Sequence, residues 1–414
     1  MRRIRYAIFC MIALVCFCGS YMTIAGKEEI KQNTVIDQKA AAPLKRAESQ
    51  KEEKEIATLY AKEALLMDGT SGRVLYQKDG YQRHAMASTT KIMTAIYVME
   101  HCDLEGEAVV SQNAANQPKV HMGVRKGERY LVRDLLYALM LESYNDCAVV
   151  LAEHVGGSVE AFCKEMTKYA HDMGCVDTSF ETPNGLDSEN HYTTPYDLAR
   201  ITKYALENKE FSGIVKTKTY SFQEVQGQRQ VTVYNKDAFL DQYMGAIGVK
   251  TGFTGNAGYC FVGAVKRDRK YFISVVLASG WPPNKTYKWK DTMALMDYGK
   301  ENYENVPIIK DGTKIGMVHV EDGKEDAVVA LIRGSSEALL SRKDQVSTKL
   351  RIKKKLEAPI KKGEQIGTLS VQINGTCYKK LKICTARAVE REPLSATIYR
   401  YYQRYIAGGM RHGT

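Results

Sequence analysis

The chain has 414 residues, enough to bury a full hydrophobic core and to form two domains. Hydrophobic residues make up 44% of it, which excludes a wholly disordered protein. The formal net charge of +11 favours an anionic surface as a partner. Because no nucleic-acid-binding module is recognisable, we expect no nucleic-acid partner.

The N-terminus has the pattern of an export signal. A basic segment precedes a short apolar run, and small residues follow near a cleavage point. These features are Arg2, Arg3 and Arg5, the apolar run 7–17, and the small residues Thr23 and Ala25. An uncleaved membrane anchor is the alternative, although the apolar run is short for a full span. With either a signal peptide over residues 1–25 or an anchor, we expect the rest of the chain outside the cytoplasm.

The next segments read as a stalk, a hairpin and a helical region. Residues 26–55 are rich in Lys, Glu, Gln and Ala and lack aromatic residues, which indicates a flexible or partly helical stalk. Residues 63–80 look like two strands around the turn at 68–72. From residue 88 to about 208 the apolar residues recur at helical spacing.

Strands return from about residue 215. Three β-rich runs separated by short turns indicate an antiparallel meander, and residues 289–303 read as a closing helix. The β-rich runs are 246–253, 259–266 and 271–279. We therefore predict an α+β domain over residues 56–304, in which a helical insertion interrupts a sheet.

A second, small all-β domain is expected over residues 305–392, where strand-like runs follow one another with little helix. Within it, the run KLRIKKKLEAPIKK (349–362) is interpreted as the solvated face of a strand. The tail, residues 393–414, carries aromatic residues at mixed helical spacing. It fits a membrane-contacting amphipathic segment or a capping helix equally well.

The first candidate for chemistry is HAMASTTKIMTA (84–95), which opens an apolar helical run with Ser88 and Lys91. Residues three apart share a helix face, with their Cβ atoms about 5–6 Å apart. A serine hydroxyl is a weak nucleophile until a base takes its proton, and a neutral amine can serve if burial or another cation lowers its pKa. Ser88 at a helix N-terminus would also offer its backbone N–H to an oxyanion. Alone, this pattern is weak, because most chance matches are surface residues.

The second candidate is SYNDCA, beginning at Ser143, which separates two apolar helical runs. Asp146 could simply cap the later helix. Capping does not explain Ser143 and Asn145, two polar residues between helices that are expected to be buried.

The third candidate is VKTGFTGNAG, beginning at Val249, at the end of a predicted strand. Thr251 can donate to a substrate carboxylate, and Lys250 adds positive charge. Gly252 has no side chain and would let an extended substrate lie against the strand edge. An ordinary strand end before a glycine-rich hairpin is the alternative.

The three patterns occur in order, and S-x-x-K, S-x-N and K-T-G are the set shared by penicillin-binding proteins and class A β-lactamases. From about residue 56 to 390 the chain resembles the D-alanyl-D-alanine carboxypeptidases of the low-molecular-mass penicillin-binding proteins. The resemblance implies a β-lactamase/transpeptidase-like domain followed by the small all-β domain. It is carried by RHAMASTTKIMTA, LESYNDCAVVLAEHVGG, MGCVDTSFETPNGLDSENHYTTPYDLARI, VKTGFTGNAGYCFVGA, WKDTMALMDYG and LEAPIKKGEQIGTLSV.

The resemblance implies an acyl-enzyme mechanism. Ser88 would attack the carbonyl between two D-alanines at the end of a peptidoglycan stem peptide, and Lys91 would accept its proton. Ser143 would relay a proton to the leaving amine, and Asn145 would help to hold Lys91 and the substrate. Water would then hydrolyse the acyl-enzyme, while a β-lactam should acylate Ser88 instead. No metal or organic cofactor is implied.

Substrate binding is implied at the strand carrying K-T-G, with the backbone N–H groups of Ser88 and Phe253 forming the oxyanion hole. The implied substrate-binding residues are Lys250, Thr251, Gly252, Phe253 and Lys288. Two residues depart from the family pattern. Tyr144 stands where the family often has glycine, which would narrow the cleft. Lys288 stands where relatives often have arginine, so it keeps the charge but loses the bidentate fork.

Other functions are less well supported by the sequence. A β-lactamase would need a water-activating glutamate, and Glu181 is not spaced from Asn184 as that class requires. A catalytically weak wall-binding or scaffolding protein on the same fold is disfavoured because all three motifs are intact. A Ser-His-Asp hydrolase is disfavoured because no G-x-S-x-G elbow occurs. The expected location is the outer face of the cytoplasmic membrane or the wall of a bacterium, with an anionic wall polymer or membrane surface as a further partner.

Overall fold

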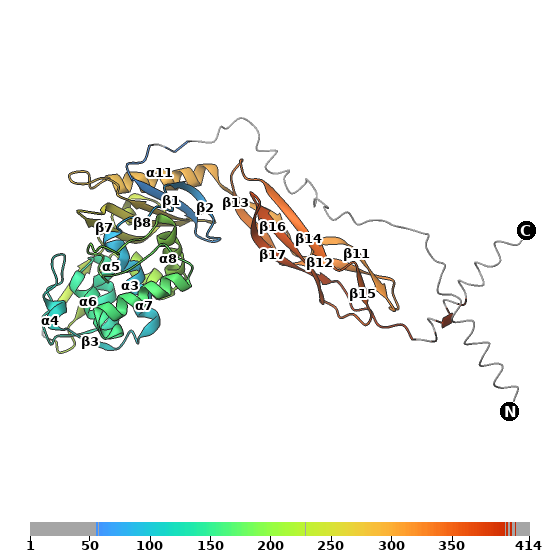
Figure 1. The fold of residues 1–414 in the computed structure, drawn as a ribbon, viewed down its shortest axis with the longest axis horizontal. Helices are drawn as coiled ribbons and strands as arrows, with labels where there is room; N and C mark the ends of the chain where they lie inside the picture. The colour runs from blue at the N-terminus through green and yellow to red at the C-terminus, as the bar shows by residue number, and fades with distance from the viewer. Residues whose placement is uncertain are drawn as a thin grey trace, which may run out of the picture.

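The computed structural model describes residues 55–56, 58–227, 229–393, 395, 398–399 and 402. The expected signal peptide, and almost all of the expected stalk and tail, lie outside this part of the chain. Figure 1 shows a body of mixed helices and strands, followed in the chain by an elongated body of strands. Within the described residues, no helix is both long and apolar enough to cross a membrane.

The first body is built on a five-stranded antiparallel sheet with the order β2-β1-β9-β8-β7. Its strands are β1 (Glu63–Asp68), β2 (Val74–Lys78), β7 (Ala246–Thr254), β8 (Gly258–Arg267) and β9 (Lys270–Leu277). The predicted hairpin and meander are therefore confirmed. β1 is buried at every position because alternate side chains enter two different cores. The helix α11 (Tyr287–Asn302), predicted over 289–303, closes the smaller core on one face.

The helical insertion lies between β2 and β7, and most of it packs on the other face of the sheet (Figure 1). Its helices are α3 (Lys91–His101), α4 (Gln112–Ala115), α5 (Val132–Leu141), α6 (Asn145–Gly156), α7 (Val159–Asp172), α8 (Pro195–Glu207), α9 (Lys209–Lys216) and α10 (Phe239–Gln242). The last short helix, α10, instead places Phe239 in the smaller core. The insertion also holds two small hairpins, β3 (Glu107–Val109) with β4 (Arg129–Leu131) and β5 (Thr219–Gln223) with β6 (Gln230–Tyr234). The first of these was missed because strands of three residues are too short to show alternation.

The start of the S-x-x-K helix differs from the prediction. The helix was expected to begin at Ser88, but residues 87–90 form the 3₁₀ turn η1 (Ala87–Thr90), and α3 begins at Lys91. The Thr89 and Thr90 hydroxyls donate to carbonyls three residues earlier, at 2.6 and 2.8 Å. Such local bonds compete with the α-helical pattern. In a 3₁₀ turn the side chains at i and i+3 eclipse, which brings Lys91 over Ser88.

The second body is all-β, as predicted. Its main sheet has six strands in the order β14-β16-β17-β12-β11-β15, and β10 (Glu304–Ile309) pairs with β13 (Ser336–Leu340) beside it. The six strands are β11 (Lys314–Glu321), β12 (Ala327–Arg333), β14 (Val346–Ile352), β15 (Lys355–Glu357), β16 (Gln365–Ile373) and β17 (Thr376–Thr385). β14 alternates exposed with half-buried residues, which confirms the solvated face expected in the lysine-rich run. The domain boundaries expected at 56–304 and 305–392 stay predictions.

Candidate active site

Lys91 is the centre of the candidate site. Its side chain is fully buried, and Nζ lies 2.8 Å from Ser88 Oγ, 2.9 Å from Asn145 Oδ1 and 2.6 Å from the Asn184 carbonyl oxygen. Burial lowers the pKa of Lys91 well below its usual range, and the nearby charge of Lys250 lowers this pKa further. Both effects favour the neutral amine.

The three neighbours of Lys91 determine where a neutral amine points its lone pair. The Asn145 Oδ1 atom and the Asn184 carbonyl can only accept hydrogen bonds, so they take the two N–H groups. In the structure Lys91 Nζ also donates to Ser88 Oγ, and the Ser88 hydroxyl donates to the Asn184 carbonyl at 3.3 Å. If neutral Lys91 keeps its two N–H groups on the Asn145 and Asn184 oxygens, its lone pair is left for the Ser88 hydroxyl, which is the arrangement that a general base needs.

The orientation of the Asn145 amide is set by the segment before it. The Asn145 backbone N–H donates to the Val120 carbonyl at 2.8 Å, and Nδ2 lies 3.3 Å from the Pro118 carbonyl. Because Nδ2 is used there, the amide oxygen is left to accept from Lys91.

Asp146 does not occupy the cap position of the following helix, although its carboxylate accepts the Cys147 backbone N–H of the first turn at 2.9 Å. Tyr144 occupies the cap position of α6, and Asp146 lies in its first turn. The Asp146 carboxylate also accepts the backbone N–H groups of Met122, Gly123 and Val124, at 2.7–3.2 Å. It thus fixes the loop that orients Asn145, a contact across more than twenty residues that sequence spacing does not reveal.

Two glycines allow backbone segments to approach the turn that carries Ser88. A Cβ atom added to Gly252 on β7 would lie 3.0 Å from the Ser88 backbone nitrogen. Gly252 therefore makes room for η1, whereas the sequence suggested room for a substrate. A Cβ added to Gly185, whose φ is +86°, would lie 2.0 Å from the Ala87 carbonyl oxygen. Neither position has space for a side chain.

The remaining residues of the third motif lie along β7, which is an edge strand of the sheet. Lys250 is buried and donates to the Thr251 carbonyl at 3.1 Å. Burial lowers the pKa of Lys250 to about 7, although the charge of Asp237 opposes this shift. Phe253 is 43% exposed and packs against Tyr259, with a ring-centroid separation of 4.6 Å. The open edge of β7 is available to an extended peptide.

Lys288 lies near the start of α11, with Nζ 4.8 Å from the ring centre of Tyr259 and 4.9 Å from that of Trp289. Burial lowers the pKa of Lys288. Tyr259 lies on β8 and pairs with Phe253 of β7 in the sheet. The contact with Tyr259 therefore places Lys288 near the third motif.

Ser143 lies between α5 and α6, two residues before Asn145, with a left-handed backbone at φ +68°. Among the hydrogen bonds of the described residues, none joins it to Ser88 or Lys91. Tyr144 beside it is half-buried, and burial raises the pKa of its hydroxyl. The structure thus joins Ser88, Lys91 and Asn145 by hydrogen bonds and brings Gly252 against them. It places Ser143, Thr251, Phe253 and Lys288 only on neighbouring elements.

Three site residues were missed by sequence reasoning: Asn184, Gly185 and His191. The Asn-Gly dipeptide is a turn signal that could have indicated the backbone approach. His191 is buried, and its Nδ1 accepts the Glu181 N–H at 3.0 Å. Its Nε2 therefore carries the proton and donates to Thr90 Oγ1 at 2.8 Å. Through Thr90, His191 supports the turn on which Ser88 lies.

His191 gives a pH-dependent stability. Burial lowers its pKa to about 4 in the folded chain, against about 6.5 when unfolded. The unfolded state therefore binds a proton first as pH falls, and stability is lost between pH 6.5 and 4. We expect this residue alone to cost about 3 kcal/mol over that window.

The check is urea unfolding followed by fluorescence of Trp281 and Trp289, the two tryptophans of the chain, which both lie in the first body. His191→Gln should lose about 3 kcal/mol less than the parent chain between pH 6.5 and 4. Equal losses in the two proteins would show that His191 is not held neutral.

Glu181 is not available as the water-activating base of a β-lactamase. Its carboxylate accepts from the Ser188 hydroxyl and from the backbone and side chain of Asn190, all within its own loop. The Ser188 hydrogen bond, with those from Asn190, holds the pKa of Glu181 below its usual range. A carboxylate stabilised in this way is a weak base.

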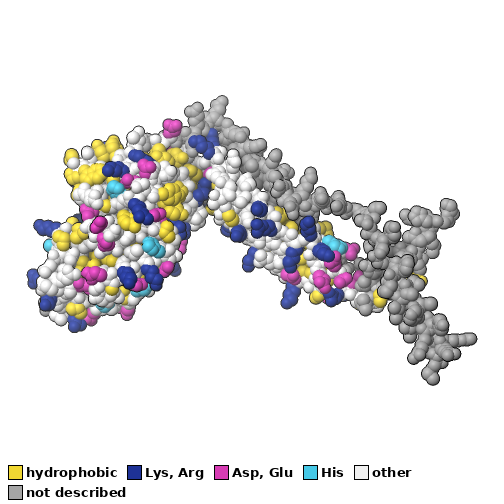
Figure 2. Space-filling model, viewed as in Figure 1, with side chains coloured by type: hydrophobic (Ala, Val, Ile, Leu, Met, Phe, Trp, Pro, Cys, Tyr) yellow, Lys and Arg dark blue, Asp and Glu magenta, His cyan; other side chains and the backbone are white. Residues whose placement is uncertain are grey.

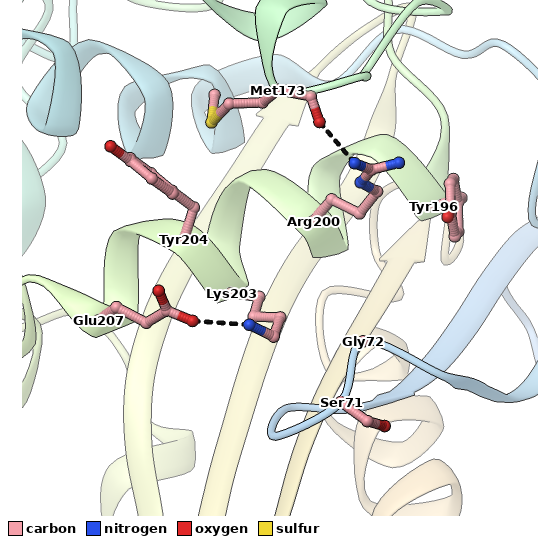
Figure 3. Close-up of a pocket in the computed structure, with 8 residues that line it drawn as sticks. All are labelled: Ser71, Gly72, Met173, Tyr196, Arg200, Lys203, Tyr204 and Glu207. Carbon is pink, nitrogen blue, oxygen red and sulfur yellow. Dashed lines mark hydrogen bonds and ion pairs between the residues drawn. The ribbon is translucent and has the colours of Figure 1, made fainter. Parts of the chain in front are cut away.

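A separate open pocket of about 520 Å³ lies beside α8, away from the three motifs. Figure 3 shows Arg200 reaching the Met173 carbonyl and Lys203 paired with Glu207. Its charged groups are thus already partnered, and none of the predicted site residues lines it.

Comparisons with known proteins identify the family. A family model described as D-alanyl-D-alanine carboxypeptidase matches residues 47–280, and a second, described as penicillin-binding protein 5, C-terminal domain, matches residues 303–391. The D-alanyl-D-alanine carboxypeptidase DacF of Bacillus subtilis is 32% identical over 76% of this chain and 82% of its own length. The D-alanyl-D-alanine carboxypeptidase of Streptomyces sp. K15 is 36% identical over 58% of this chain and 88% of its own.

Solved structures show the same likeness. Penicillin binding protein 5 from Haemophilus influenzae superposes with a TM-score of 0.67 at 26% identity, covering 82% of this chain and all of that one. The Streptomyces K15 DD-transpeptidase gives a TM-score of 0.56 at 33% identity, over 60% of this chain and 99% of that one. The chain, with its buried lysine beside Ser88 and its C-terminal β domain, therefore belongs to the D-alanyl-D-alanine carboxypeptidase family of low-molecular-mass penicillin-binding proteins.

Proposed function

We propose that the chain is a serine D-alanyl-D-alanine carboxypeptidase that works through an acyl-enzyme on Ser88. The observation that carries this proposal is the fully buried Lys91, whose Nζ lies 2.8 Å from Ser88 Oγ between two acceptor-only neighbours. Family membership supplies the substrate class, a peptidoglycan stem peptide ending in D-Ala-D-Ala.

The first half of the reaction forms the acyl-enzyme. Ser88 Oγ attacks the carbonyl carbon of the penultimate D-alanine while its proton passes to the lone pair of Lys91. The backbone N–H groups of Ser88 and Phe253 stabilise the oxyanion. When the C–N bond breaks, the proton moves from Lys91 through Ser143 to the amine of the leaving D-alanine.

The second half regenerates the enzyme. A water molecule gives its proton to Lys91 as its oxygen attacks the acyl carbonyl, and Ser88 takes the proton back as the ester bond breaks. A β-lactam acylates Ser88 by the same steps, because attack of Ser88 Oγ opens the lactam ring. Its amine remains attached to the acyl group, so deacylation is hindered.

The terminal carboxylate of the substrate would bind where positive charge and a hydroxyl donor meet. Lys250 and Lys288 supply the charge, and the Thr251 hydroxyl supplies the donor. The peptide would lie along the open edge of β7 as an added strand.

The test is release of D-alanine from diacetyl-Lys-D-Ala-D-Ala. The parent chain should release it, Ser88→Ala should release none above background, and Ser221→Ala, on the exposed hairpin β5–β6, should match the parent. A parent chain that binds penicillin covalently but releases no D-alanine would overturn the proposed carboxypeptidase activity. It would still support Ser88 as a reactive nucleophile. A chain that does neither would favour a binding or scaffolding role.

We further propose that the enzyme is exported and acts at the wall, in keeping with the N-terminal pattern and with relatives that act on peptidoglycan. The second body supports a contact with an anionic wall polymer. Sheet register aligns basic residues of β14, β17 and β12 on one exposed face, with β16 lying between β14 and β17. These residues are Arg333, Lys349, Arg351, Lys380 and Lys382, all exposed. Figure 2 shows Lys and Arg side chains along this body.

Reversing two of these charges should weaken binding to such a polymer. With soluble polyglycerol phosphate as the probe, Lys349→Glu with Lys380→Glu is expected to bind at least about thirtyfold more weakly at low salt. Each lost basic residue near an anionic surface contributes about 1 kcal/mol, and the new carboxylates add repulsion. The control reverses Lys209 and Lys216 on α9 of the first body. Equal weakening by both pairs would show that binding depends only on net charge and not on this face. Binding to anionic vesicles but not to the polymer would indicate that the face contacts a membrane.

A further inference from the structure

A buried carboxylate outside the three motifs lies just before α10, the short helix that packs on the strand carrying Lys250. Asp237 lies between β6 and α10 and is 5% exposed. Its Oδ1 accepts the Phe239 backbone N–H at 3.0 Å, whereas Oδ2 is buried and has no hydrogen-bond partner among the described residues. Burying a carboxylate oxygen without a donor is costly, so another interaction is needed to explain its position.

The cations that act on the Asp237 carboxylate come from two other elements, and neither makes an ion pair with it within 4.0 Å among the described residues. Lys250 lies on β7, against which α10 packs, and Lys288 lies on α11. Both interact electrostatically with the Asp237 carboxylate. The other charged neighbour is Asp241 on α10, which is exposed and paired with Lys218. Asp237 is thus the buried counter-charge of the two lysines expected to hold the substrate carboxylate.

The carboxylate is held firmly in place. The Asn235 side chain accepts the Asp237 backbone N–H at 3.0 Å and donates to the carbonyls of Val215 and Thr217, at 3.1 and 2.9 Å. On the other side, Phe239 is fully buried in the smaller core. A carboxylate anchored on both sides acts as a fixed charge.

The charge of Asp237 affects the pKa of Lys250, and the charge of Lys250 affects the pKa of Lys91. Burial raises the pKa of Asp237 to about 7 and lowers the pKa of Lys250 to about 7, and each charge stabilises the other. The charge of Lys250 in turn lowers the pKa of Lys91. The other groups facing these lysines are Asp146, Cys147 and His191 around Lys91, and Cys260 and Lys285 around Lys288.

We propose that Asp237 is a positioning residue that keeps Lys250 charged, so that Lys250 can both hold the substrate carboxylate and keep Lys91 neutral. This inference rests on the proposed carboxypeptidase activity. Without Asp237, Lys250 would lose its proton at lower pH. At alkaline pH, neutral Lys250 would then no longer bind the substrate carboxylate. At lower pH, where Lys250 is still charged, Lys91 would remain an adequate base.

The test is Asp237→Asn, because the asparagine Oδ1 can still accept from Phe239 and the turn is preserved. For release of D-alanine, the alkaline limb of kcat/KM should move down by about one pH unit, as expected for loss of an opposite charge near an ionised group. At pH values below that limb the variant should match the parent chain. Asp237→Glu should restore part of the shift, and Asp241→Asn, which removes the exposed neighbour, should leave the limb in place.

A fall in kcat/KM by the same factor at every pH would overturn the proposal and leave Asp237 as a turn former. A second readout does not depend on activity. In protein labelled with ¹³C at the lysine Cε, the signal of Lys250 should titrate at lower pH in Asp237→Asn than in the parent chain. An unchanged titration of Lys250 would overturn the inference about Asp237, whether or not the parent chain releases D-alanine. Failure of the parent chain to release D-alanine would separately refute the proposed activity.

Discussion

Lys91→Met is expected to slow acylation of Ser88 by a penicillin by about 10²–10⁴-fold, the usual contribution of a general base. Methionine fills a similar volume but offers no lone pair to the hydroxyl. The Asn145 and Asn184 oxygens lose their donor, which costs about 1–3 kcal/mol of stability, and burial of the methionine offsets part of that cost. The variant should therefore stay folded and nearly inactive.

Stopped-flow labelling with a fluorescent penicillin measures this effect. Lys164→Met, which removes an exposed lysine from α7, is the matched control and should label like the parent chain. Labelling of Lys91→Met within tenfold of the parent rate would mean that another group takes the serine proton.

Gly185→Ala is expected to lose about 3–5 kcal/mol of unfolding free energy and most of the acylation rate. The backbone at Gly185 has φ +86°, which is costly for alanine, and the new Cβ would lie 2.0 Å from the Ala87 carbonyl oxygen. Because that contact is with backbone, η1 must move, and Ser88 would move with it.

The control is Gly213→Ala, in the middle of α9, where an added Cβ meets nothing within 4 Å. Alanine is about 1 kcal/mol better than glycine inside a helix, so this variant should be stabilised. Urea unfolding read from the tryptophans would distinguish the two. A Gly185→Ala protein as stable as the parent would contradict the close approach seen in the structure.

Elements with a strong local pattern were predictable from the sequence. These elements are the buried strand at 63–68, the meander from 246 and the closing helix at 287–302. Each has a run of apolar residues long enough to indicate a strand or a helix. The all-β second body was predictable for the same reason. The 3₁₀ turn was not, because it depends on where the Thr89 and Thr90 hydroxyls bond.

The candidate site was predictable where ordered motifs mark it. Ser88, Lys91 and Asn145 were named from the sequence, and the structure joins them by hydrogen bonds. Asn184 was missed because its backbone carbonyl, and not its side chain, binds Lys91. Asp237 was missed because its proposed effect depends on burial of its carboxylate near β7, and only tertiary packing creates that environment.

The most direct test of the central claim is to locate the acyl group itself. The intact chain would be incubated with benzylpenicillin, digested, and mapped by mass spectrometry. We predict one adduct per chain, on the peptide that contains Ser88, and none in Ser88→Ala. An adduct on any other residue, or no adduct from an otherwise folded chain, would contradict the assignment of Ser88 as the nucleophile.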